Sequence, residues 1–403
     1  MGASGDNIRP LQQELFPWRE KGVIPERITQ VRELRGLTKS ALADHLGVSP
    51  GAITQWENGS KRPDMSHTVR MARLLAVPAA YFQSPIPPEV GRIPLITFRS
   101  TAAARLRRLN LQASRLAELA GEAMAWVCRA IALPECRIPN LEALGSSAVF
   151  DAGAAAMTCR RELGLGDRPI HQLAELMESK GVLVVPAKIG GTGFDAFSCV
   201  VNARPFIFLG THRNSRSRTR FDTAHELAHL VLHQHLSTDD LLDRATLRRM
   251  EQQADAFAGA FLMPCEAFRQ DLQDLREVTL PALLRLKPKW GTSLSAMVRR
   301  AYDLDRIDTG RYTVLNAEIS SKGWKGKRPE PCEEEVPLTV GRLAAKCLRL
   351  VHSRLPAQAA AMSAELPLPT EILCDLFAMP ADQLHGMLPE PRIIPMPGIG
   401  PQP

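Results

Sequence analysis

The sequence has no long hydrophobic run. None of its segments reaches the roughly 18 consecutive apolar residues that a membrane-spanning helix requires. The first six residues, Met1-Gly-Ala-Ser-Gly-Asp6, also lack the basic and apolar regions of a secretory signal peptide. We therefore expect a cytoplasmic protein with no membrane partner.

Closely spaced cysteine pairs are missing as well. The chain contains 8 cysteines, but none of them forms the Cys-x-x-Cys pair that is typical of zinc ribbons and redox sites. Their scattered positions do not resemble a disulfide framework either. We expect reduced thiols, most of them buried.

Aromatic residues are few, at 5% of the chain, whereas 45% hydrophobic and 23% charged residues describe an ordinary globular protein. A length of 403 residues suits two or three domains. The net charge of +7 permits nucleic-acid binding but does not establish it. Helical periodicity dominates, with strand character only near residues 181–210, so the predicted fold is mainly α with a small β-sheet (α+β).

Residues 27–82 contain five short helical patterns separated by glycine and proline breaks. Thr38 and Ser49 are placed to cap the helices that follow them. Pro50 stands at the first position of the second of these helices, where its missing N–H costs little. The pattern predicts a compact, all-helical N-terminal domain.

The run from Leu37 to Gly59, which ends in Trp-Glu-Asn-Gly, resembles a Cro/XRE-type helix-turn-helix domain. The resemblance implies that residues 49–56 form the recognition helix, which enters the major groove of an operator in double-stranded DNA. It places Ser49, Gly51, Thr54 and Gln55 near base edges or phosphates, with Gln55 the best candidate for reading a base. It also places Lys39, Lys61 and Arg62 on the sugar-phosphate backbone. A homodimer is expected, because this class usually reads two half-sites.

Two features limit this interpretation. Pro50 and Gly51 carry no side-chain donor, which weakens base reading and predicts modest selectivity. The alternative is a domain that makes protein contacts only, but the basic loop Ser60-Lys61-Arg62 favours DNA.

Two histidines four residues apart, with a glutamate directly after the first, form a zinc-peptidase pattern at His225-Glu226-Leu-Ala-His229. Positions i and i+4 share one face of a helix, so both imidazoles can reach one ion. Glu226 lies beside them as a general base for water. A short apolar strand at 207–210 and a helix from about 218 to 233 provide a suitable context.

A catalytic zinc needs three protein ligands and an open position for water. The helical segment 249–264 offers Glu251 as the third ligand, and Asp255, one turn later, is placed to orient a ligating imidazole. His233 and His235 compete for the ligand role. However, His225, His229 and His233 would span roughly 12 Å of helix and cannot converge on one ion.

The segments 220–233, 251–258 and 262–264 together resemble the ImmA/IrrE-type metallopeptidases, and in particular bacterial regulators in which a Cro/XRE domain is fused to this peptidase domain. The resemblance implies a zincin-like fold in which His225, His229 and Glu251 bind Zn²⁺ and Glu226 is the general base. Ala228 departs from the usual glycine, and we expect slightly tighter packing there.

Three further expectations concern the surroundings of this pattern. An edge strand within Ser198 to Phe208 would hold an extended substrate by backbone pairing. His212 is a lesser candidate for transition-state stabilisation, because an ordinary loop histidine is the simpler interpretation. The acidic run 333–335 is either a solvated linker, which is favoured, or a latch for the arginines at 213, 216, 218 and 220.

The predicted organisation has six parts. These are an N-terminal leader (1–22), the helix-turn-helix domain (23–84), a linker and helical region (85–145), the metallopeptidase domain (146–310), a helical C-terminal extension (311–388) and a disordered tail (389–403). The predicted function is a DNA-binding transcriptional regulator whose zinc metalloendopeptidase domain acts on, or senses, a protein or peptide partner. The alternatives are a ligand-sensing transcription factor that cleaves nothing, and an antitoxin-like autorepressor of a toxin–antitoxin operon.

Overall fold

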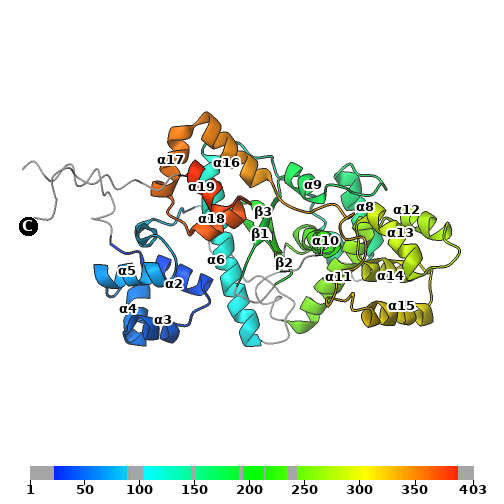
Figure 1. The fold of residues 1–403 in the computed structure, drawn as a ribbon, viewed down its shortest axis with the longest axis horizontal. Helices are drawn as coiled ribbons and strands as arrows, with labels where there is room; N and C mark the ends of the chain where they lie inside the picture. Colours follow the sequence, from blue (N-terminus) through cyan, green and yellow to red (C-terminus); the bar gives the residue numbers. More distant parts are fainter. Residues whose placement is uncertain are drawn as a thin grey trace, which may run out of the picture. The chain divides into compact units, whose positions relative to one another are not determined.

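A computed structural model describes residues 22–88, 90, 103–146, 150–189, 194–212, 215–234 and 243–388. These residues form helices and one small sheet (Figure 1), which confirms the predicted α+β class. They divide into two compact units: the first contains the described residues within 1–90, 119–132 and 345–403, and the second those within 91–118 and 133–344. The predicted leader and tail lie outside the described residues, except for residue 22.

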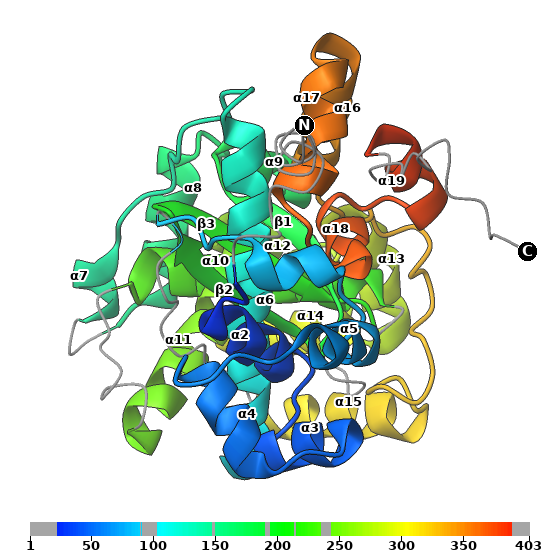
Figure 2. The ribbon, with the colours of Figure 1, turned by 90° about the vertical axis from the view of Figure 1, so that its left-hand side faces the viewer.

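The N-terminal part of the first unit consists of short helices that lie together (blue in Figure 2). They are α2 (Pro25–Leu34), α3 (Lys39–Leu46), α4 (Pro50–Glu57), α5 (Met65–Leu74) and the 3₁₀ helix η1 (Ala79–Gln83). The predicted caps are present, since the N–H of Ala41 donates to Thr38 Oγ1 at 3.0 Å and the N–H of Ala52 donates to Ser49 Oγ at 3.2 Å. Each cap satisfies a donor that the first helical turn leaves unpaired.

The first unit extends beyond these helices. It also contains the C-terminal end of α6 (Ala103–Cys128), most of α16 (Leu343–Arg354), and the helices α17 (Pro356–Glu365), α18 (Thr370–Leu376) and α19 (Ala381–Met387). Arg27 on α2 is fully buried and forms a salt bridge of 2.8 Å with Glu122 on α6, whose side chain is also fully buried. On the same helix, Trp126 Nε1 donates to Glu365 on α17 at 3.0 Å. These contacts join segments that are far apart in the sequence.

The second unit contains the sheet, whose strand order is β1-β3-β2. Strands β1 (Leu183–Ala187) and β3 (Arg204–Gly210) are parallel, whereas β2 (Ala196–Val201) and β3 are antiparallel. The edge strand expected within 198–208 is β2, which ends at Val201; the chain turns at Asn202 and Ala203, and β3 lies at the centre of the sheet. Both turn residues have positive φ values, 51° and 58°, as a two-residue hairpin turn requires.

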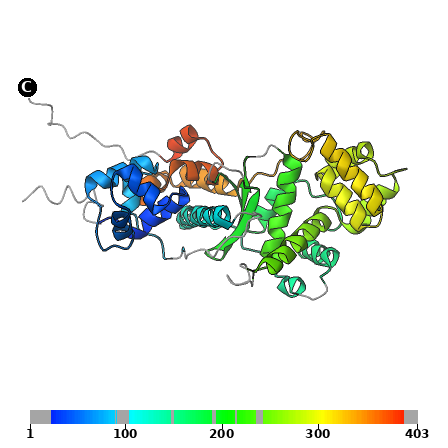
Figure 3. The same cartoon turned by 90° about the horizontal axis from the view of Figure 1, so that it is seen from below.

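The helices α10 (Arg216–Leu232) and α11 (Arg244–Leu262) pack together next to the sheet (green in Figure 3). Their apolar faces share one buried core with β3, α8 (Ala152–Glu162) and α9 (Leu173–Ser179). Ala228 is fully buried in this core. The packing fixes α10 and α11 relative to each other, and these are the helices that carry the predicted metal ligands.

The remaining helices of the second unit form a bundle (yellow in Figure 3). They are α12 (Cys265–Gln273), α13 (Leu280–Trp290), α14 (Leu294–Asp303) and α15 (Thr309–Ser321). The short α7 (Glu142–Gly145) contacts α10 instead. Leu315 and Ile319 of α15 are buried in the same apolar cluster as Trp290 and Met297. Residues beyond 310 therefore belong to this compact unit, because their apolar face has its partners here.

Two broader expectations can be compared with these units. All eight cysteines are free, but only Cys159 and Cys347 are buried while Cys128 and Cys136 are exposed, so the expectation of mostly buried thiols is wrong. No helix in the described ranges is both long and apolar enough to cross a membrane.

Candidate metal centre and DNA-binding helix

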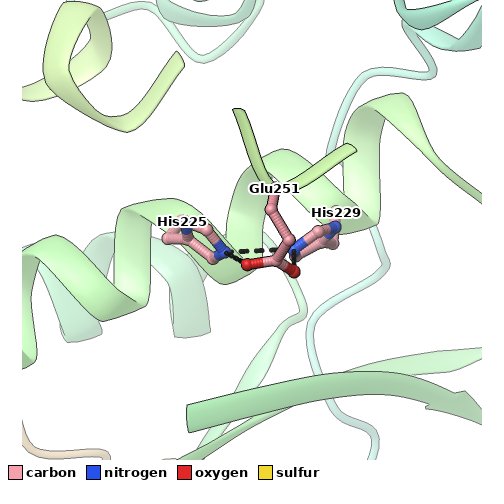
Figure 4. A group of neighbouring side chains, drawn as sticks. All are labelled: His225, His229 and Glu251. Carbon is pink, nitrogen blue, oxygen red and sulfur yellow. Dashed lines mark hydrogen bonds and ion pairs between the residues drawn. The ribbon is translucent and has the colours of Figure 1, made fainter. Parts of the chain in front are cut away.

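The structure brings His225 and His229 of α10 together with Glu251 of α11 (Figure 4). The two histidines face Glu251 from successive turns, with their Nε2 atoms 3.1 Å apart. The Glu251 carboxylate faces both histidines: its Oε2 lies 3.5 Å from His225 Nε2, and its Oε1 lies 3.4 Å from His229 Nε2. Among the described residues, this is the one group of three or more His, Cys, Asp or Glu side chains that converge closely enough to hold an ion.

The donor atoms have separations close to those that a tetrahedral ion demands, although His225 faces Oε2 of Glu251 and His229 faces Oε1. Bonds of 2.0–2.1 Å at tetrahedral angles put neighbouring ligand atoms about 3.3–3.4 Å apart. The observed separations of 3.1, 3.4 and 3.5 Å surround that value. Two imidazoles and one carboxylate also form a usual ligand set for catalytic zinc, which leaves a fourth position for water. The residues therefore fit a bound metal ion.

Hydrogen bonds hold both imidazoles from behind. His225 Nδ1 lies 3.0 Å from Asp255 Oδ1, the contact expected from the sequence. His229 Nδ1 lies 3.0 Å from His233 Nδ1, and His233 Nε2 lies 3.0 Å from Gln253 Oε1. His233 thus contacts Nδ1 of His229 and lies outside the three-residue group, and its i+4 spacing from His229 was the available signal. The other competitor, His235, lies outside the described residues.

Gln253 is a residue that the sequence did not single out. It is buried, and its Nε2 donates to the carbonyl oxygen of Gly145 at 3.0 Å, which fixes the amide while its Oε1 faces His233. Its contact with His233, which in turn contacts His229, connects it to the same centre. The series of hydrogen bonds from Gly145 through Gln253 and His233 to His229 sets the orientation of the His229 imidazole.

The charges in the candidate centre favour an ion pair between protonated His225 and ionised Glu251. Burial alone would lower the pKa of His225, but hydrogen bonds to Asp255 and Glu251 and the negative charge of Glu226 outweigh it and raise the pKa to about 10. Burial tends to raise the pKa of Glu251, yet the two histidines hold it well below its usual range. In the absence of metal, His225 therefore carries a proton that an incoming cation must displace.

Glu226 lies beside the ligands and contacts the edge strand. Ser198 Oγ on β2 donates to Glu226 Oε2 at 2.7 Å, and Glu226 is 8% exposed. The sequence pointed to the strand but not to this contact. By contrast, His212 lies outside the three-residue group, and its Nε2 is 3.7 Å from Asp195 Oδ1. Glu226 is therefore held by the edge strand and lies close enough to His225 for its charge to raise the pKa of that histidine.

Comparison with protein-family models separates the chain into two parts. Residues 28–82 match the helix-turn-helix family model, and residues 177–302 match the model described as the IrrE N-terminal-like domain. The chain joins a Cro/XRE-type domain to an IrrE/ImmA-like domain. The latter is a metallopeptidase family, which fits a metal cofactor, and the matched range contains the sheet, α10 and α11. No curated protein matches the chain in a sequence comparison.

The acidic run 333–335 agrees with the favoured expectation only in part, because Glu334 and Glu335 are exposed but Glu333 is half-buried. Glu333 is neither solvated nor paired with the arginines: its Oε1 lies 2.6 Å from the fully buried Lys287 Nζ, and its Oε2 accepts the N–H of Ser217 at 3.1 Å. It therefore places a negative charge at the N-terminus of α10, where the helix dipole favours one. Arg216 instead donates to the carbonyl oxygen of Glu334 at 2.7 Å. Arg213 lies outside the described residues.

In the helix-turn-helix domain, α4 carries the predicted recognition residues. Ser49, Gly51 and Thr54 are exposed and Gln55 is half-buried, so this face of α4 is open to a ligand. Lys39 of α3 reaches the same face, with its Nζ 3.5 Å from Thr54 Oγ1 and 3.3 Å from Glu57 Oε2. The exposed Lys61 and Arg62 follow in the next loop. The geometry places Lys39 and Thr54 together.

Proposed function

We propose that this DNA-binding regulator carries a zinc-dependent endopeptidase in its IrrE-like domain. The observation that carries the proposal is the triangle formed by His225, His229 and Glu251, with donor separations of 3.1–3.5 Å and Glu226 beside it. Zinc is preferred because its common catalytic ligands are imidazole and carboxylate in a tetrahedral set.

A zinc ion held by these three residues would supply Lewis acidity, which polarises a peptide carbonyl and acidifies a water molecule. Glu226 would accept the proton of the attacking water and deliver it to the leaving amine. Ser198 would hold the Glu226 carboxylate in the orientation for this transfer, through its 2.7 Å hydrogen bond. Asp255 and His233 would keep the two imidazoles directed at the ion, with contacts of 3.0 Å each.

The proposed substrate is an extended segment of a protein or peptide partner. Support comes from β2, which lies at the sheet edge and carries Ser198 next to Glu226. An edge strand offers unpaired backbone groups to a peptide that adds to the sheet. Val200, which is 43% exposed on this strand, provides an apolar contact beside that backbone.

Two measurements test the peptidase proposal in sequence. The metal content of purified protein should be close to one zinc per chain and should be lost in His229→Ala. Candidate partner proteins should then be cut by the wild type and left intact by Glu226→Gln. Equal cleavage by both would sink the assignment of Glu226, and zinc retained in His229→Ala would sink the assignment of the site.

For the helix-turn-helix domain, we propose that α4 reads an operator in duplex DNA as part of a homodimer. Gln55 would read a base, Ser49, Gly51 and Thr54 would lie against base edges or phosphates, and Lys39, Lys61 and Arg62 would hold the backbone. Light scattering should give the mass of a dimer, and the preferred site should contain two half-sites about one DNA turn apart. A monomer on a single half-site would contradict the dimer.

A second candidate function is a sensor that regulates DNA binding without cleavage. The observation that favours it is a cavity at the N-terminal end of α10, lined by side chains that the peptidase chemistry does not use. In that case Glu226→Gln would bind and release the operator like the wild type. Loss of the regulatory response in Glu226→Gln would favour the peptidase instead.

A further inference from the structure

A cavity of about 170 Å³ lies in the second unit. None of the three candidate metal-binding side chains is among its lining residues. Its walls come from the carboxyl ends of β1 and β3, the N-terminal turn of α10 and the extended segment 338–341. The lining includes Pro186, Leu209, Thr211, Arg216, Thr219 and Thr339. Nothing in the proposed peptidase chemistry uses this place.

The position has a physical rationale as a ligand site. β1 and β3 are parallel, so their carboxyl ends meet at one edge of the sheet, where crevices of open α/β sheets take up ligands. The α10 helix begins at the same edge, and a 17-residue helix presents a partial positive charge at its N-terminus. Glu333 uses part of that terminus, but the ammonium group of Lys287, 2.6 Å away, balances its charge.

An unpartnered hydroxyl provides an independent observation. Thr339 is only 5% exposed and lines the cavity, yet its Oγ1 has no hydrogen-bond partner in the described part of the chain. A buried hydroxyl without a hydrogen-bond partner is destabilising, and native proteins rarely contain one. A ligand in the cavity would supply the missing partner.

The residues on both sides of Thr339 are apolar but exposed. Leu338 is 52% exposed and Val340 is 39% exposed, although both are apolar and both line the cavity. The segment thus alternates exposed apolar and buried polar side chains, which is the reverse of a solvated strand. An apolar ligand body between them and the wall of Pro186 and Leu209 would cover these side chains.

Arg216 gives the cavity its charge. It is half-buried, and one nitrogen of its guanidinium, Nη1, donates to the carbonyl oxygens of Glu334 at 2.7 Å and Val336 at 3.3 Å. These bonds hold the guanidinium at the cavity wall and use only two of its five N–H groups. Both partners are neutral carbonyls, so the positive charge stays uncompensated by them, and no acidic side chain is among the lining residues.

We propose that this cavity binds a small organic anion, a carboxylate with a short apolar body. The carboxylate would accept from Arg216 and Thr339, and the body would lie between Leu209 and Val340. A dry cavity of about 150 Å³ holds a benzene molecule, so 170 Å³ suits roughly six to eight non-hydrogen atoms. The proposal is independent of peptidase activity, because none of the residues involved belongs to the metal centre.

The test is calorimetry on the full chain with butanoate, pentanoate and hexanoate, each compared with its neutral amide. A chelator is present, and His229→Ala is measured in parallel, so that binding of carboxylate to metal does not interfere. We expect saturable binding at one site, at least about tenfold weaker for each amide, because a hydrogen bond to a charged group is replaced. The same affinity in His229→Ala is expected.

Two variants then locate the site. Thr339→Val removes the unpartnered hydroxyl while keeping its shape, so the fold should be retained and the affinity should fall about tenfold. Val340→Glu, at a partly exposed position, should weaken binding at least as much by repulsion. Thr313→Val, whose hydroxyl is exposed on α15, should change nothing. The proposal is overturned by no saturable binding, by amides that bind as well as acids, or by binding that neither variant weakens.

Discussion

His225 Nδ1 and Asp255 Oδ1 lie 3.0 Å apart, and this contact joins the metal-facing side of α10 to α11. It fixes the ring of His225 and leaves Nε2 for the ion. We predict that Asp255→Ala lowers zinc affinity by about 10–100-fold, the usual cost of losing a carboxylate behind a histidine ligand. Competition against a coloured chelator measures the change. Asp303→Asn, on the surface of α14, is the control and should leave the affinity unchanged.

The pH dependence of metal binding follows from the same pair. Because the pKa of His225 is raised to about 10 without metal, the ring must lose a proton for binding throughout the neutral range. Apparent zinc affinity should therefore fall by about tenfold for each unit of pH below 10. Glu251, whose pKa is held below its usual range, stays ionised and adds no further dependence.

Zinc affinity should rise with pH, whereas the stability of the protein without metal should fall with pH. The raised pKa of His225 contributes stability that is fully present below its unfolded value of 6.5 and is lost as pH rises towards 10. The melting temperature in chelator should fall over this range, while the increase produced by zinc should grow. Thermal scans at pH 6.5, 7.5 and 8.5 measure both. An increase that does not vary with pH would contradict the protonated state of His225.

The contact of Ser198 with Glu226 predicts a kinetic effect without metal loss. Ser198→Ala removes a 2.7 Å charge-assisted hydrogen bond, so kcat for a cleaved partner should fall about tenfold while KM and zinc content remain. Ser198→Thr keeps a hydroxyl and should recover most of the rate. Ser321→Ala, on the exposed end of α15, serves as the control. An equal loss in Ser198→Thr would indicate a steric effect rather than the hydrogen bond.

Local rules explain what the sequence predicted well. The caps at Thr38 and Ser49 depend on residues three positions away, and the sharing of one helix face by His225 and His229 depends only on the helical period. Such features are fixed by short segments and need no knowledge of the tertiary fold. Glu251 was proposed as the third ligand because it stands on a second strongly helical segment, and the family resemblance then supported it.

Long-range contacts explain what was missed. The Lys287–Glu333 pair joins residues far apart in sequence, so an acidic run next to basic residues gave no sign that it would be buried against α10. The division of the region of strand character into β2 and β3 could not be read from the sequence, because the turn between them has Ala203, not glycine, at a positive φ of 58°. The contact of Gln253 with His233 could not be predicted, because it depends on the packing of α11 against α10.

A stability prediction concerns the salt bridge between Arg27 and Glu122, whose side chains are both fully buried. Glu122→Gln would leave the guanidinium without its counter-charge, and breaking a buried pair costs about 3–5 kcal/mol. Hydrogen exchange of the α2 amides should accelerate accordingly. The matched control is Glu318→Gln, which breaks a surface pair of 3.6 Å with Lys322 and should cost under about 1 kcal/mol. Similar effects of both changes would contradict the importance of burial.

The proposed DNA contacts divide into those that read sequence and those that hold the backbone. Gln55→Ala should lower affinity for the preferred operator by about 1–3 kcal/mol while leaving binding to random DNA unchanged, because base contacts carry the discrimination. Lys61→Ala should weaken both kinds of binding equally and reduce the salt dependence by about one charge per chain. Fluorescence anisotropy with the two DNA types, at several salt concentrations, separates these outcomes. Asp44→Ala, exposed on α3 and not among the proposed contacts, would remove a negative charge without touching α4, so it should not lower the affinity for either DNA. If Gln55→Ala weakened random and specific DNA alike, Gln55 would be a backbone contact, and base reading would have to come from other residues on α4.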